Sequence, residues 1–261
     1  MNRAICVNTW RQFKSNNVRL ILLTLMILLP LGGTTLMRCN SSVAVDDACL
    51  SPPFIATLFT LLWGIGVIGC ERQHGTISLV LSRPVSISRY VFSKWLAVSI
   101  AASICSLQAL LIEQFVSVVL SPSLMFNTEF VANGLERVLL CFSTASVLVF
   151  FSSLVTGIKD LALIAGVLFA GQLVRSFFEP LTYNSGHFLG LSQVPSFIIN
   201  FYKACADAYC VFLYPNIPVA DILNGSAEFF TYLINYTCVI TVSLSMAIFF
   251  LSRKEYSYAH E

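Results

Sequence analysis

The stretch Glu71–Trp95, ERQHGTISLVLSRPVSISRYVFSKW, is the longest charge-bearing segment between the hydrophobic runs of this chain. It opens with charged residues and a glycine, continues as a short amphipathic piece over residues 76–82, breaks at an Arg-Pro pair and ends on basic residues. A plain linker would not carry a run of aliphatic side chains among its polar residues. Because membrane-length apolar runs lie on both sides, we interpret the segment as the docking element of a membrane protein.

Composition supports a membrane location. Of the 261 residues, 57% are hydrophobic and 11% are charged, whereas soluble domains carry about 25% charged residues. The chain is therefore predicted to be an all-α integral membrane protein. The net charge of +2 and the lack of a dense Lys/Arg block argue against nucleic-acid binding. The first apolar run follows several basic residues and has no convincing cleavage site, so we expect a retained first helix.

Six stretches approach the roughly 20 apolar residues that a membrane-spanning helix needs. They cover residues 19–37, 54–70, 95–120, 138–156, 161–178 and 229–251, within a single domain over residues 1–261. Pro30, Gly32 and Gly33 predict a kink in the first span. The fourth and fifth spans are four residues apart, at 157–160, so they are expected to form an antiparallel hairpin.

The distribution of lysine and arginine predicts the orientation. With the N-terminus inside, four basic residues fall outside: Arg38, Arg137, Arg175 and Lys203. The other eleven of the fifteen fall inside: Arg3, Arg11, Lys14, Arg19, Arg72, Arg83, Arg89, Lys94, Lys159, Arg253 and Lys254. Both termini and the segment Glu71–Trp95 are therefore expected in the cytoplasm.

Two further helices are expected to lie along the membrane surfaces. Before the first span, Cys6, Trp10 and Phe13 share one helical face, which we expect to enter the lipid of the inner interface; the alternative is a solvated tail. In the long loop between the fifth and sixth spans, apolar residues recur at helical spacing between Pro195 and Pro215. This pattern predicts an amphipathic helix on the outer side.

Motifs for catalysis or nucleotide binding are weak. The GIGVIG run at residues 64–69 has the G-x-G-x-x-G spacing, but it lies inside an apolar span. A dinucleotide site requires a strand before the motif and a helix after it, so close helix packing by small residues explains these glycines better. No G-x-x-x-x-G-K-[ST] motif and no histidine pair at metal-ligand spacing is present. If ATP drives this protein, the ATPase is another chain.

Three other polar or reactive residues are site candidates. Cys39 and Cys49 fall on the predicted outer side, where a disulfide can persist, and they could be bridged or free. Glu113 is the acid that lies well inside a span, and intramembrane acids are candidates for function. Eighteen residues beyond Trp95, it would lie about 27 Å along the helix, near the outer interface. That depth favours a headgroup-level or interhelical role over a transport site.

The segment Glu71–Trp95 resembles the corresponding region of ABC-2 type permeases, the membrane subunits of ABC transporters. The residues that carry the resemblance are Glu71, Gly75, Thr76, Ile77, Leu81, Ser82, Arg83, Pro84, Val85, Ser86, Arg89 and Lys94. The surface helix before the first span, the six-span layout, residues 214–216 and the basic end after the sixth span agree more weakly. The layout is most similar to six-span exporters whose ATPase is a separate subunit.

Local chemistry fits a coupling helix between spans 2 and 3. Glycine allows a sharp exit from the membrane helix, threonine caps the next helix and proline stops it. Glu71 could pair with Arg83, Arg89 or a cation of the ATPase. The predicted ATPase-coupling residues are Glu71, His74, Gly75, Thr76, Ile77, Leu79, Leu81, Arg83 and Pro84. The alternative is an ordinary amphipathic loop on the membrane.

The resemblance implies a non-catalytic permease subunit of an ATP-driven exporter in the plasma (inner) membrane. Its expected partners are an ABC ATPase subunit that binds ATP and Mg²⁺, a second permease chain in a homodimer or heterodimer, and membrane lipids. No cofactor is expected on this chain. The alternatives are an intramembrane enzyme acting on lipid-like substrates, an ion-gradient transporter and a membrane scaffold.

Overall fold

A computed structural model describes residues 3–14, 19–25, 52–73, 86–120, 128–155, 217–223 and 229–258, and the single residues 17, 204 and 225. In this part of the chain the regular elements are helices, and no strand is present. They are α1 (Arg3–Lys14), α3 (Pro52–Gly64), α4 (Gly69–Gln73), α6 (Ile87–Leu120), α7 (Thr128–Leu154), α10 (Val219–Leu223) and α11 (Phe229–Tyr258). Residues 19–25 are also helical.

Four helical segments among the described residues are long and apolar enough to cross a membrane: Ile55–Arg72, Ile87–Phe115, Phe130–Leu154 and Phe229–Arg253. They correspond to the predicted second, third, fourth and sixth spans. The prediction of an all-helical membrane protein is therefore confirmed for this part of the chain. Most of the predicted first span, the fifth span at 161–178 and nearly all of the predicted outer helix lie outside the described residues.

Two helices begin before the predicted spans. Helix α6 begins at Ile87, ahead of the span predicted at 95–120, and α7 begins at Thr128, ahead of the span predicted at 138–156. In both cases the apolar run was delimited at a basic residue, Lys94 or Arg137. Each of these residues lies inside its helix, because an acidic residue of a neighbouring helix pairs with it.

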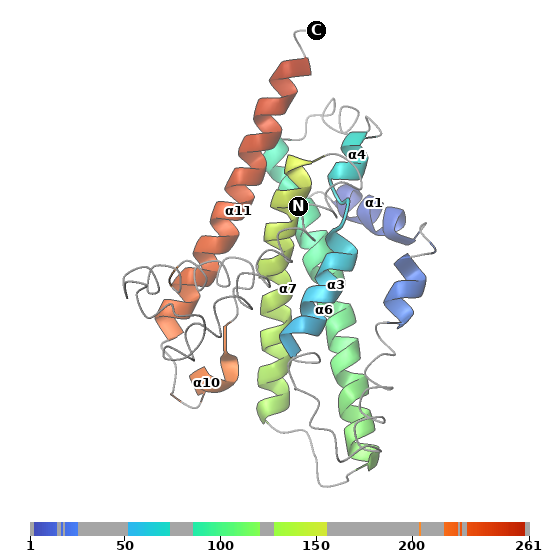
Figure 1. The fold of residues 1–261 in the computed structure, drawn as a ribbon, viewed down its shortest axis with the longest axis vertical. Coiled ribbons are helices and arrows are strands. Elements are labelled where there is room, and N and C mark those ends of the chain that lie inside the picture. The colour runs from blue at the N-terminus through green and yellow to red at the C-terminus, as the bar shows by residue number, and fades with distance from the viewer. Residues whose placement is uncertain are drawn as a thin grey trace, which may run out of the picture.

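Helix α7 lies at the centre of the described bundle and packs against α3, α6 and α11, while α1 packs against α6. Figure 1 shows α6 and α7 running side by side, with α1 and α4 near one end of the bundle. We call this end, which also holds the C-terminal part of α11, the α1 end. Small residues allow close approach of the helices. A Cβ atom on Gly64 would lie 2.8 Å from Cδ1 of Leu148 in α7.

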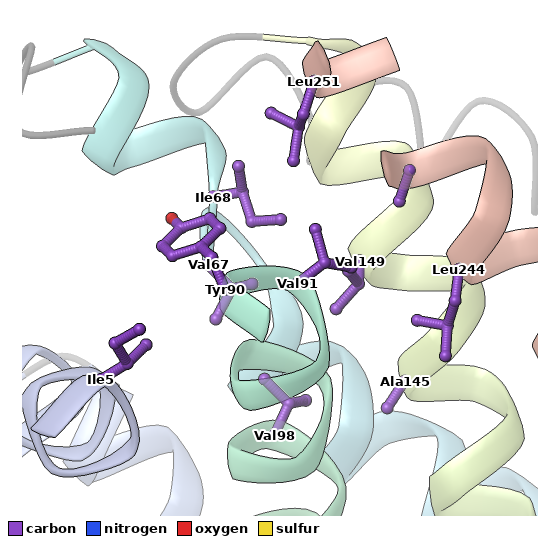
Figure 2. Packing of buried hydrophobic residues seen from close by; sticks show 11 residues of the cluster. Ile5, Val67, Ile68, Tyr90, Val91, Val98, Ala145, Val149, Leu244 and Leu251 are labelled. Atoms are coloured by element: carbon purple, nitrogen blue, oxygen red, sulfur yellow. The ribbon is translucent and has the colours of Figure 1, made fainter. Parts of the chain in front are cut away.

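A buried apolar cluster at the α1 end joins α1, α6, α7 and α11 with the residues between α3 and α4 (Figure 2). It combines Ile5 of α1, Val67 and Ile68 between α3 and α4, Tyr90, Val91 and Val98 of α6, Ala145 and Val149 of α7, and Leu244, Ala247 and Leu251 of α11. A second cluster between α3, α6 and α7 contains Ile55, Ala56, Phe59, Ala102, Cys105, Ala109, Leu140 and Cys141. The first cluster places α1 inside the packed structure, next to the start of α6.

Candidate functional site

The second span is broken just before Glu71. Helix α3 ends at Gly64, and α4 begins at Gly69. Between them Gly66 adopts φ +70°, and a Cβ atom there would lie 2.6 Å from the Cys70 sulfur. A residue other than glycine is strained in this left-handed conformation. The packing role expected for the glycine run holds for Gly64, but Gly66 breaks the helix, which the sequence analysis did not predict.

Side chains from other helices stabilise the break. The Ser152 hydroxyl of α7 accepts hydrogen bonds from the backbone N–H groups of Ile68 and Gly69, each at 3.1 Å. The Arg19 guanidinium donates to the carbonyl oxygen of Ile65 at 2.9 Å. Broken helices are tolerated in membranes where neighbouring groups satisfy the released backbone. These contacts fix the direction in which α4 leaves the span and thereby the position of Glu71.

Glu71 is the centre of a buried polar cluster that also contains Gln12, Tyr90 and Lys94, called here the Glu71 cluster. The Lys94 ammonium lies 2.6 Å from Oε1 of Glu71, to which Nε2 of Gln12 donates at 3.0 Å. The Tyr90 hydroxyl donates to Oε2. Glu71 is 4% exposed, and Lys94 is fully buried. Since Tyr90 and Lys94 are four residues apart on α6, they lie on one helical face and contact the same carboxylate.

Among the described residues, Glu71 forms an ion pair with Lys94, a partner that was not predicted. Of the predicted candidates within the chain, Arg89 is exposed, and Arg83 lies outside the described residues. A helix that begins at Ile87 brings Tyr90 and Lys94 one turn apart toward α4. The i, i+4 spacing of Tyr90 and Lys94 is a signal in the sequence for a shared helical face. It indicates such a face only if the helix begins before Tyr90, and the predicted span begins at Trp95.

Helix α1 docks on the protein with the face that was predicted to enter lipid. Cys6 and Phe13 are buried, and the Phe13 ring stacks on Trp63 at 3.5 Å between centroids. The Cys6 thiol donates to the Ser93 carbonyl at 3.4 Å, and burial raises the pKa of this thiol above its ordinary value of 9.0. The predicted amphipathic helix is present, but the lipid-facing assignment of Cys6 and Phe13 is wrong, because α6 and α3 offer them an apolar surface.

Glu113 forms an ion pair with Arg137, which joins α6 to α7. Nη2 of Arg137 lies 2.6 Å from Oε2 of Glu113. Arg137 is 3% exposed, whereas the Glu113 side chain is 21% exposed. The structure therefore places Glu113 in an interhelical contact. Glu113 was predicted as a site candidate, whereas Arg137 was expected on the outer side.

The two ion pairs lie a membrane thickness apart. Along α6, Lys94 and Glu113 are nineteen residues apart, which corresponds to about 28 Å. The hydrocarbon core of a bilayer is about 30 Å thick. Placing one pair at each boundary leaves the apolar length of α6 inside the core. This spacing is consistent with the Glu71 cluster at one interface and the Glu113–Arg137 pair at the other.

Several predicted site residues lie outside the described part of the chain. They are His74, Gly75, Thr76, Ile77, Leu79, Leu81, Arg83 and Pro84 of the coupling segment and the cysteines Cys39 and Cys49. Among the described residues, no group of three His, Cys, Asp or Glu side chains could hold a metal ion. The described site is thus a set of interhelical ion pairs and hydrogen bonds. Such contacts can position helices, and they include no arrangement of a nucleophile with a base.

Together, four membrane-length helices and buried charge pairs at their ends define a multi-span helical membrane protein. The family model for the ABC-2 family transporter protein matches residues 19–180, more than half of the chain. The chain therefore belongs to the ABC-2 transporter family, as the resemblance of residues 71–94 predicted. The family indicates a non-catalytic membrane permease subunit that associates with an ABC ATPase. No curated protein matches the chain.

Proposed function

We propose that this chain is the permease subunit of an ATP-driven exporter in the plasma (inner) membrane. The family match over residues 19–180 carries the proposal. The chain would form one ABC-2 domain over residues 1–261 with six spans and both termini in the cytoplasm. Two permease chains, identical or different, would assemble with two ATPase subunits, which bind ATP and Mg²⁺. Lipids would surround the spans.

Residues 74–85 form the contact with the ATPase in this proposal. Both flanks of the segment are held together, since Glu71 precedes it and bonds to Tyr90 and Lys94, which follow it. Between these flanks the segment has twelve residues. In this proposal its aliphatic residues Ile77 and Leu79 would enter a groove on the partner protein.

The geometry changes the role proposed for Glu71. Its carboxylate accepts hydrogen bonds from three side chains of this chain and is almost fully buried. A direct contact with the ATPase would require breaking the ion pair with Lys94, which is costly at a buried site. We therefore assign Glu71 to holding the flanks of residues 74–85, and the contact itself to Ile77, Leu79 and Leu81.

Co-purification with the ATPase tests the proposal. A tagged permease expressed with its P-loop ATPase partner should retain the ATPase, and the Leu79→Asp/Leu81→Asp double variant should release it. Leu223→Asp is the matched control, because Leu223 is 68% exposed on α10, away from α1 and α4. Full retention of the ATPase by the double variant would refute the assignment of residues 74–85.

A further inference from the structure

Helix α1 contacts both flanks of residues 74–85. On the preceding flank, Phe13 stacks on Trp63 of α3, and Gln12 donates to Glu71 of α4. These two adjacent residues of α1 therefore contact both parts of the broken second span. The helix is fixed to the break at the position from which residues 74–85 emerge.

On the following flank, α1 packs against the first turns of α6. The Cys6 thiol donates to the Ser93 carbonyl, and Nε1 of Trp10 donates to the Ala97 carbonyl at 3.1 Å. Both spacings are four residues, so one face of α1 contacts one face of α6. Because α1 contacts both flanks, a movement of one flank relative to α1 would break several contacts at once.

The contact between Gln12 and Glu71 differs from the others in its chemistry. The contacts of Cys6, Trp10 and Phe13 with α6 and α3 are ring stacking and hydrogen bonds to backbone carbonyls. Gln12 instead donates to the charged group that also holds Tyr90 and Lys94. Bonds to a charged partner are stronger than bonds between neutral groups. Gln12 is thus the residue of α1 that joins the buried ion pair directly, although it is itself exposed.

We propose that Gln12 is a positioning residue that ties α1 to Glu71, so that α1 and both flanks of residues 74–85 move as one rigid body. The tie is a property of the permease alone. Its role in transport rests on the proposed function: when the ATPase displaces residues 74–85, α1 moves with them and remains docked throughout the cycle. Helix α1 is then a part of the moving unit rather than a stationary anchor in the membrane surface.

The native Cys6 thiol reports on the docking of α1. It is buried against α6, and N-ethylmaleimide can modify it where α1 detaches. Trypsin releases it in the peptide of residues 4–11, which mass spectrometry quantifies against the unfolded chain. In the purified permease, modification should be at least about tenfold slower than in the unfolded chain, because a docked thiol reacts only through local opening.

Variants of Gln12 should change the rate of Cys6 modification. Because Glu71 is negatively charged, the rate should increase in the order Lys, Met, Glu at position 12. Gln12→Lys keeps a donor and should protect Cys6 at least as well as the native residue. Gln12→Met removes the donor and should raise the modification rate about fivefold, and Gln12→Glu, which opposes Glu71, should raise it further. Asn8→Glu is the control, since Asn8 is exposed one turn away on α1. Equal rates for the Lys, Met and Glu variants would overturn the tie.

The same measurement in the complex with the ATPase tests the rigid body. The rate of Cys6 modification should stay within about twofold between the nucleotide-free state and the state with bound ATP. A rise of fivefold or more on ATP addition would overturn the proposal, because α1 would then detach during the cycle. Failure of the ATPase to bind would instead contradict the proposed function, and it would leave the Gln12 series in the isolated permease unaffected.

Discussion

Replacing Lys94 by methionine perturbs the Glu71 cluster with little change in side-chain volume. The apolar stem of the lysine remains, while the ammonium that lies 2.6 Å from Glu71 is lost. The Tyr90 and Gln12 hydrogen bonds to the carboxylate remain available. The substitution therefore isolates a single physical effect, the loss of the positive partner of a carboxylate that is 4% exposed.

The size of the effect follows from the burial of both charges. Breaking a buried ion pair by removing one partner costs about 3–5 kcal/mol, and the two remaining hydrogen bonds place the cost near the lower limit, at about 3 kcal/mol. Glu71→Gln should cost a similar amount, since it leaves the fully buried Lys94 without its partner. The double variant Glu71→Gln/Lys94→Met should cost less than either single variant, because no unpaired charge remains buried.

Thermal unfolding of the purified permease in detergent compares these variants. A loss of about 3 kcal/mol lowers the Tm of a chain of this size by about 6–12 °C. Arg89→Met is the matched control: Arg89 is exposed on the first turns of the same helix, and the change should stay within about 0.5 kcal/mol. The reasoning is refuted if Lys94→Met is as mild as Arg89→Met, or if the double variant loses the sum of the two single effects.

Three other predictions follow from the same contacts. Glu113→Gln should lower the thermal stability more than Arg137→Met by about 1–2 kcal/mol, since Arg137 is 3% exposed and the 21% exposed Glu113 can reach water; equal losses would contradict this. Ser152→Ala removes the acceptor of two buried N–H groups and should cost about 1–3 kcal/mol of thermal stability. Ser153→Ala is the control, because the Ser153 hydroxyl donates to a carbonyl of its own helix, and it should cost less than about 1 kcal/mol in the same assay. Burial raises the pKa of the Cys6 thiol, and alkylation requires the thiolate, so the midpoint of the alkylation rate against pH should lie higher in the folded permease than in the unfolded chain; equal midpoints would show that α1 is not docked.

The sequence was sufficient for the parts of the fold that depend on local composition. Long apolar runs predicted the spans that the structure contains, and the segment around Glu71 identified the family. The sequence did not show that the helices extend beyond the apolar runs at Lys94 and Arg137. A basic residue beside a hydrophobic run marks the end of the apolar run, but in both cases the helix continues past it, and an acid from another helix pairs with the basic residue. A single sequence does not show which helices are neighbours.

The break of the second span was missed for a related reason. Three glycines at 64, 66 and 69 are equally compatible with close packing along a straight helix and with a turn. What distinguishes Gly66 is its positive φ, which is stable there because Ser152 and Arg19 satisfy the released backbone groups. The deciding residues lie far away in the chain, so the local pattern could not reveal the break.

Helix α6 is continuous whereas the second span is broken, and this difference suggests how a displacement would pass through this permease. Helix α6 is unbroken over 34 residues, about 51 Å at the usual helical rise, and it carries Lys94 near one end and Glu113 toward the other. The second span, by contrast, is interrupted at Gly66 directly before Glu71. A movement of residues 74–85 would therefore reach the second span at this break, where the helix is interrupted between Gly64 and Gly69. Through the ion pair with Lys94, the same movement would displace α6 as a stiff rod, and the Glu113–Arg137 pair would transmit it to α7 on the other side of the membrane.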